Sequence, residues 1–417
     1  MKLTYTHTRI ACYIAFVVQA AVCCLSALLF AAFTTEFSFT FTELSAIVAV
    51  TFIAQMSIDI FATKYIGKIG YRNGLIISCS AAAIGFFLLG VLPYVLPPFI
   101  GVLIAVAVYS MGGGFVDVIV SPLVEALPAK NKAAQMSLLH SFFCWGTLFI
   151  ILFTTGFFAL FSVENWRYLC MLLALFPLFS LLLFFKVPII EPPAEEIAFT
   201  AKVLFSTPVF YVLALLMLFA GACEQLMSQW ASFFAECGLG VEKEVGDLLG
   251  PGLFAVTMGG VRTFFGVKQS KISLKRALTV SGVACALCYA LCVFAPYPIL
   301  SLIACALTGA AVGLMWPGCV SIAAKRIPLG GAKMYAMLAL FGDVGCIAGP
   351  GLVGILSDEV EKLGGGVFAN FISGASATEI ALKAGIFVGI IFPIALCITI
   401  VLLKRKTAQA QANQSNK

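Results

Sequence analysis

Charged residues and histidines are scarce in this sequence. Among 417 residues, 11% are charged and two are histidine, whereas an ordinary soluble chain is roughly 25% charged. No HExxH, no GxSxG and no group of paired histidines occurs, so the common zinc-enzyme and serine-hydrolase patterns are missing. We therefore predict no enzyme, no bound metal and no cofactor. The net charge of +6 is accounted for by lysines and arginines in loops, so we expect no nucleic-acid partner.

Metal-binding neighbours are also missing around the fifteen cysteines, most of which lie inside apolar segments where cysteine behaves as a small hydrophobe. Cys285, Cys288 and Cys292 share one helical face, yet no histidine or carboxylate accompanies them. Because only Cys237 lies close to a predicted outer loop, we expect no disulfide.

Apolar residues, in contrast, make up 62% of the chain. A surplus of this size has to face lipid, and a bilayer-spanning helix needs about 20 apolar residues. The sequence therefore predicts an all-α polytopic membrane protein, in contact with the lipid bilayer, with twelve transmembrane helices. The predicted spans are 10–33, 44–63, 74–92, 98–125, 135–160, 167–185, 207–235, 248–266, 277–295, 299–323, 334–356 and 380–403.

Basic residues fix the predicted orientation. Nearly all of the 25 Lys and Arg lie at alternate helix ends, on the face that both chain termini share. Cytoplasmic loops carry the excess of Lys and Arg in membrane proteins. We therefore place both termini in the cytoplasm and expect a multi-pass protein of the cell's inner (cytoplasmic) membrane. The exceptions on the opposite face are Arg167, Lys243, Lys362 and Lys383.

One segment interrupts the pattern of spans. Residues 186–206 hold three prolines and three glutamates between six predicted helices and six more. The halves echo one another, since Lys68–Arg72 after the second span resembles Lys271–Lys275 after the eighth. We predict two pseudo-symmetric six-helix bundles with a site between them. Their bounds are 1–185 for the first bundle, 186–206 for a cytoplasmic linker, 207–403 for the second bundle and 404–417 for a cytoplasmic tail.

Polar residues inside the spans are the candidate functional residues. A charge at bilayer depth is costly unless it faces a cavity or a partner. We place Arg262 close enough to the cytoplasmic end of its helix to reach water, which leaves the acids without a deep basic partner; an unpaired buried carboxylate readily takes up a proton. The residues concerned are Asp59, Asp117, Glu224, Asp343, His140, Gln19 and Gln55.

Asp117 and His140 form a predicted pair. They lie about nine residues before and eight residues after the Pro128–Lys132 turn, so both are roughly 12–14 Å from it along their helices. One interpretation is a proton site coupled to substrate; the other is a hydrogen bond that ties two helices together. For Asp343, a cavity position and a helix contact both remain open.

The seventh predicted span carries two polar stripes. Glu224 and Ser228 are one turn apart, as are Gln225 and Gln229. Such groups suit a polyhydroxylated solute, whose ring a tryptophan could face. Trp230 also fits the aromatic belt at the membrane boundary. The predicted substrate-binding residues are Glu224, Gln225, Gln229, Trp316, Trp230, Gln19, Gln55, Asp343 and Trp145.

The fourth and fifth spans carry a family resemblance. Gly112–Gly114, Asp117 and Ser121-Pro122, followed by the stretch from Met136 to Gly146, resemble the fucose–galactose–glucose/proton symporter family of the major facilitator superfamily. The resemblance implies the major facilitator fold, a sugar-like substrate and proton coupling through Asp117. It places His140 where the family has a glutamine. The family's second acid, on the first span, is missing here, and Asp59 is the candidate replacement.

Together these features predict secondary active transport of a small polar solute, a sugar-like molecule above all, driven by protons and carried out by a monomer. Two alternatives stay open. One is a facilitator or exporter of another polar metabolite or drug. The other is a non-transporting nutrient sensor on a transporter scaffold, although the short tail Thr407–Lys417 offers no signalling domain.

Overall fold

The computed structural model describes residues 3–128, 132–190, 201–268, 273–328, 330–372 and 376–415, and all regular elements in these ranges are helices. Within the described residues, twelve helical segments are long and apolar enough to cross a membrane. The predicted all-α class and the twelve spans are therefore confirmed. The predicted helix ends are less accurate, because most helices extend several residues beyond the apolar stretch from which they were predicted.

Eight helices form the first half of the molecule. They are α1 (Tyr5–Leu28), α2 (Phe30–Phe37), α3 (Phe41–Ile69), α4 (Tyr71–Leu89), α5 (Pro98–Ala126), α6 (Lys132–Phe161), α7 (Trp166–Leu173) and α8 (Leu175–Lys186), with the 3-10 turns η1 (Leu92–Tyr94) and η2 (Val163–Asn165). The pairs α1 with α2 and α7 with α8 each run nearly without interruption, so each pair makes one crossing.

The second half begins after the short helix α9 (Ala201–Phe205), which lies inside the predicted linker. Residues 191–200 of that linker lie outside the described residues. The helices of this half are α10 (Pro208–Phe233), α11 (Lys243–Asp247), α12 (Leu253–Lys268), α13 (Leu274–Phe294), α14 (Pro298–Val312), α15 (Met315–Arg326), α16 (Gly331–Lys362), α17 (Ala377–Val388) and α18 (Ile391–Ser415). Between and beside them lie the π-helical turns η3 (Phe234–Gly238) and η4 (Leu248–Gly252) and the 3-10 turn η6 (Gly366–Asn370).

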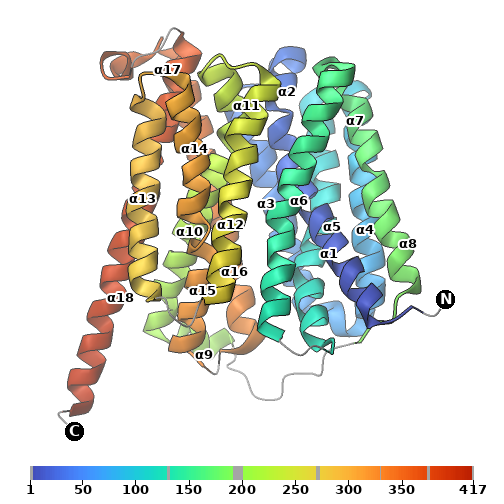
Figure 1. Cartoon of the computed structure of the whole chain (residues 1–417), viewed down its shortest axis with the longest axis vertical. Helices are drawn as coiled ribbons and strands as arrows, with labels where there is room; N and C mark the ends of the chain where they lie inside the picture. Colours follow the sequence, from blue (N-terminus) through green and yellow to red (C-terminus); the bar gives the residue numbers. More distant parts are fainter. Residues whose placement is uncertain are drawn as a thin grey trace.

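The two halves stand side by side with all long helices roughly parallel (Figure 1). Helices α1 to α8 occupy one side and α10 to α18 the other. Both chain termini lie at the same end of the bundle, called here the terminal end. Helices α2, α11 and α17 lie at the opposite end, called here the far end.

Local sequence signals set several helix ends. Thr40 and Glu43 form a capping box at the start of α3, in which each side chain accepts a hydrogen bond from the other residue's backbone N–H. Proline opens α5, α10 and α14, where its fixed backbone angle suits the first turn. Gly70, with φ of 80°, separates α3 from α4 in a conformation that other residues rarely adopt.

Candidate functional site

Four polar side chains of the first half meet inside the bundle. The Nε2 of Gln19 on α1 donates to Oδ2 of Asp117 on α5 at 2.7 Å and to Oε1 of Gln55 on α3 at 3.5 Å. The Nε2 of Gln55 in turn lies 3.6 Å from the Sγ of Cys23. These four residues, the Asp117 cluster, join three helices through side chains that can also hydrogen bond a solute.

Three consecutive glycines let α5 approach its neighbours closely enough for this cluster. A Cβ on Gly113 would lie 2.4 Å from Oε1 of Gln19, and one on Gly114 would lie 2.8 Å from the backbone oxygen of Gln55. A Cβ on Gly112 would lie 2.5 Å from the oxygen of Ser78 on α4. Each glycine therefore faces a different helix, and a side chain at Gly112 or Gly114 would collide with the backbone of its neighbour.

Two further acids face Asp117. Asp59 on α3 and Asp343 on α16 both lie close enough to interact electrostatically with it, and Asp343 belongs to the opposite half. Counted from the terminal end of their helices, Asp59, Asp117 and Asp343 lie ten, nine and twelve residues in, or roughly 13–18 Å. The three acids thus lie at a similar depth and within electrostatic range, across the boundary between the halves.

Asp117 is exposed even though it lies deep in its helix. The outward stripe of α5 is marked by the exposed side chains of Ile100, Ile104 and Met111. At about 100° per residue, Asp117 is turned roughly 120° away from Met111. Asp117 therefore lies off the lipid-facing stripe, on a side of α5 where neighbouring helices leave its side chain uncovered.

His140 on α6 is also exposed on the inner side of its helix. Its ring contacts Phe16 edge-on at 5.5 Å, and it lies within electrostatic range of Arg262 on α12. In the described residues the hydrogen-bond partner of Asp117 is Gln19, so the interpretation of the Asp117–His140 pair as a hydrogen bond between two helices is wrong. A shared role in proton coupling stays a prediction. Counting along a helical hairpin gave the right depth for both residues but could not give the direction in which each points.

Arg262 occupies a different place from the one predicted for it. Instead of reaching for water at the helix end, its Nη2 donates to Oε2 of Glu224 on α10 at 2.6 Å. The prediction that no basic residue reaches the buried acids is therefore wrong for Glu224.

The glutamines of α10 are buried beside this ion pair. The Nε2 of Gln229 donates to Oε1 of Gln225 at 2.9 Å and to the backbone oxygen of Cys23 in the other half at 3.0 Å. Gln225 is 7% exposed and Gln229 2%. Their predicted contact with substrate stays a prediction, and in this conformation they also hold α10 against α1.

The three tryptophans considered for the site lie in three different environments. Trp230 is fully buried and its indole N–H donates to the backbone oxygen of Pro350 at 3.1 Å, so its ring does not face lipid. Trp316 is partly buried against Gly342. Trp145 is 42% exposed and shares the outward stripe of α6 with Leu138 and Phe149, which favours contact with lipid.

Contacts across the halves close the far end. The backbone N–H groups of Phe41 and Thr42, at the start of α3, both donate to the carboxylate of Asp358 on α16 at 2.8 Å. Nearby, the rings of Phe30 and Trp230 pack at 5.5 Å across the boundary. Sequence reasoning missed Asp358, whose place near a helix end resembles that of a solvated residue. These contacts hold the two halves together at the far end.

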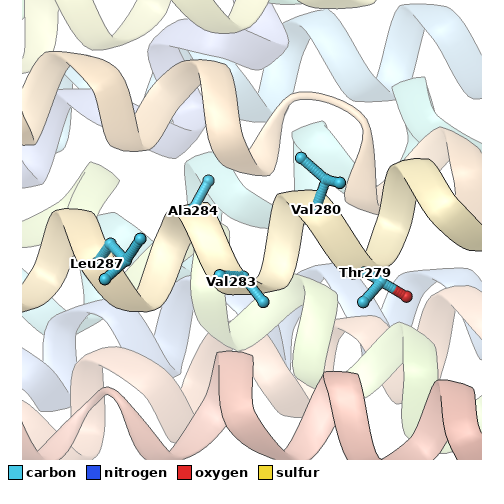
Figure 2. Close-up of a pocket in the computed structure, with 5 residues that line it drawn as sticks. All are labelled: Thr279, Val280, Val283, Ala284 and Leu287. Atoms are coloured by element: carbon cyan, nitrogen blue, oxygen red, sulfur yellow. The ribbon is translucent and has the colours of Figure 1, made fainter.

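A separate hollow of about 330 Å³ runs along α13 and is not a candidate site (Figure 2). Its lining residues Thr279, Val280, Val283, Ala284 and Leu287 project from one helix face. Val280 and Leu287 are 67% and 66% exposed. A single hydroxyl among apolar groups gives a polar solute too few partners, and this face suits lipid.

Metal binding finds no support in the described part of the chain, where no group of three His, Cys, Asp or Glu side chains could hold an ion. The cysteines there are free. The residues assembled between the halves are instead acids, amides, one imidazole and one paired guanidinium, which can bind hydroxyl groups and exchange protons.

Comparison with known proteins identifies the architecture. The family model described as Major Facilitator Superfamily matches residues 11–350. No curated protein matches the chain significantly.

Solved structures share the fold at low sequence identity. A bacterial homolog of the human lysosomal transporter Spinster, inward-facing and occupied, has a TM-score of 0.75 and 15% identity over 97% of this chain and 98% of its own. The D-xylose–proton symporter has a TM-score of 0.73 and 12% identity over 93% of this chain and 97% of its own. The fucose:proton symporter of E. coli has a TM-score of 0.63 and 14% identity over 96% of this chain and 99% of its own. Identities this low show a common fold alone.

Proposed function

This chain belongs to the major facilitator superfamily, whose members are membrane transporters rather than enzymes, and we propose that it is a proton-coupled transporter of a sugar-like solute. It works by alternating access, in which the two halves rock about a central site. The residues between the halves carry both tasks. The Asp117 cluster and its facing acids exchange the proton, and the polar groups of α10 and α12 bind the solute.

The observation that carries the proposal is that Asp59, Asp117 and Asp343 lie at a similar depth and within electrostatic range of one another across the boundary between the halves. Ionised carboxylates that share a site repel one another, and a bound proton removes part of that repulsion. Because Asp343 belongs to one half and the other two acids to the opposite half, proton binding changes the force between the halves. That is the link a proton-driven transporter needs.

Similar folds support a hydroxylated solute. Among the solved structures are a D-xylose–proton symporter, a fucose:proton symporter and a nucleoside transporter. The conformational state fits as well. The Spinster homolog described as inward-facing gives a TM-score of 0.75, and the fucose transporter in its outward conformation gives 0.62. We propose that the terminal end is the open, cytoplasmic end of a monomer in the cytoplasmic membrane.

Uptake by purified protein in proteoliposomes tests the proposal. An imposed pH gradient, acid outside, should drive accumulation of at least one solute among D-xylose, L-fucose and uridine. Dissipating the gradient with an ionophore should leave equilibration without accumulation. Uptake that the pH gradient leaves unchanged would point to a facilitator. No movement of any of these solutes, with a positive result for an unrelated metabolite, would contradict the sugar-like substrate.

A further inference from the structure

Arg262 and Glu224 form an ion pair where the two halves meet. Besides its 2.6 Å bond to Glu224, Arg262 directs Nε to the oxygen of Gly313 at 3.3 Å and Nη1 to the Sγ of Cys144 at 3.6 Å. Gly313 belongs to the second half and Cys144, on α6, to the first. The guanidinium is therefore held in place from both sides of the boundary.

The pair retains unused hydrogen-bonding capacity. A guanidinium has five N–H groups, and the described contacts use one on each of its three nitrogens. The side chain of Arg262 is 15% exposed and that of Glu224 is 7% exposed. One N–H on each terminal nitrogen thus stays available, next to a carboxylate that can accept further bonds.

The charge of the pair selects among solutes. One cation and one anion cancel, so an uncharged solute can enter without leaving a charge unpaired. A hydroxyl group accepts a bond from a guanidinium and donates one to a carboxylate, so neighbouring hydroxyls match both members. An anionic solute would bind Arg262 and leave Glu224 buried without its partner, and a cationic solute would do the same to Arg262. A buried unpaired charge is costly.

We infer that the Arg262–Glu224 pair binds adjacent hydroxyl groups of an uncharged solute and excludes charged analogues. This inference rests on the proposed transport function, adds Arg262 to the predicted binding residue Glu224 and assigns the specificity for charge to the pair. His140 on α6 faces the same guanidinium. Removing one member of the pair should then change which charge the site accepts, which a purely structural ion pair would not do.

The experiment compares solutes of similar shape and different charge. Binding of D-glucose, D-glucuronate and D-glucosamine is measured for purified protein by ligand-induced thermal stabilisation and by inhibition of counterflow. The variants are Arg262→Gln, Glu224→Gln and the double variant with both changes. Glu379→Gln is the matched control, because it neutralises a partner in the Lys383–Glu379 ion pair on α17, outside the site.

The expected result is a change in charge preference. The wild type and Glu379→Gln bind glucose and neither charged analogue. Glu224→Gln gains glucuronate binding because Arg262 is left without its anion, and Arg262→Gln gains glucosamine binding. The double variant is neutral again, excludes both charged analogues and binds glucose roughly ten-fold more weakly, since hydrogen bonds to charged groups are the stronger ones.

Three outcomes would overturn the inference. The first is a wild type that binds a charged analogue more tightly than glucose. The second is a set of single variants that lose thermal stability and keep the wild-type preference. The third is a double variant with unchanged glucose affinity. If the wild type bound and transported no member of any solute panel, the transport proposal itself would fail instead.

Discussion

Asp117 is the acid to which the structure gives the clearest set of partners. Gln19 holds it from α1, and Asp59 and Asp343 face it from α3 and α16. Asparagine has nearly the same shape, and its side-chain oxygen can accept the same bond from Gln19, but it cannot bind and release a proton. Asp117→Asn should therefore abolish accumulation driven by a pH gradient and largely preserve counterflow exchange. Both are measured in proteoliposomes.

Asp59 provides the competing assignment for the proton site. If Asp117→Asn still accumulates substrate against a gradient while Asp59→Asn does not, the proton site is at Asp59. His140→Gln serves as the milder change, because the resembled family carries glutamine at that position. Since His140 faces Arg262 rather than Asp117, this variant should alter substrate affinity more than coupling.

At the scale of the helix, α16 packs against α10 through glycine. A Cβ on Gly345 would lie 1.9 Å from the backbone oxygen of Leu218, whereas Gly351 on the same helix has nothing within 4 Å. Gly345→Ala should force the helices apart and destabilise the protein by about 1–3 kcal/mol. Gly351→Ala is the matched control and should not lower the midpoint of thermal unfolding. Equal midpoints for the two variants would contradict this account of the packing.

The start of α3 is held from the opposite half by Asp358, which accepts bonds from two backbone N–H groups. The N-terminus of a helix carries a partial positive charge, so the carboxylate also stabilises it electrostatically. Asp358→Asn should weaken far-end closure by about 1–2 kcal/mol, or roughly ten-fold in population. Hydrogen exchange of residues 38–50, followed by mass spectrometry, should become faster. The neighbouring Glu359→Gln removes only an exposed pairing with Lys362 and should leave the exchange unchanged.

Over the whole molecule, the sequence predicted the spans far better than the contacts between them. The length of an apolar stretch is enough to indicate a crossing helix, so twelve crossings could be counted. The apolar stretch ends where polar residues begin, however, and the helix can continue beyond that point. Helix α16 runs from Gly331 to Lys362, past the predicted 334–356, because its charged ends still pair their backbone groups. Depth along a helix could also be counted, which brought Asp117 and His140 to the right level.

Rotation about the helix axis and the choice of partner helix could not be read in the same way. Both depend on packing between segments far apart in the chain. Arg262 illustrates the difference, because a position near a predicted helix end fits both a side chain that reaches for water and one that turns inward to Glu224. Asp358 is a second example, because the residues whose backbone N–H groups it binds lie more than 300 residues away in sequence.

The orientation of the whole molecule is the last property to test. Both termini lie at one end of the bundle (Figure 1), and Lys and Arg concentrate in the loops of that end, so the positive-inside rule predicts that this end lies in the cytoplasm. The opposite end carries the loop with Gly364 and Gly365, whose positive φ angles mark a tight turn, beside the exposed side chains of Leu363 and Val367. That loop should lie outside.

Inserted protease sites can distinguish the two orientations without relying on the many native cysteines. A site placed in the linker after Pro193 should be cut in inside-out vesicles and protected in intact cells. The same site placed between Gly364 and Gly365 should show the reverse. Cleavage of the linker site from outside intact cells would invert the topology, because loops on one side of the bundle must share one compartment. The terminal end would then face the exterior, and the proposed direction of proton entry would have to be reversed with it.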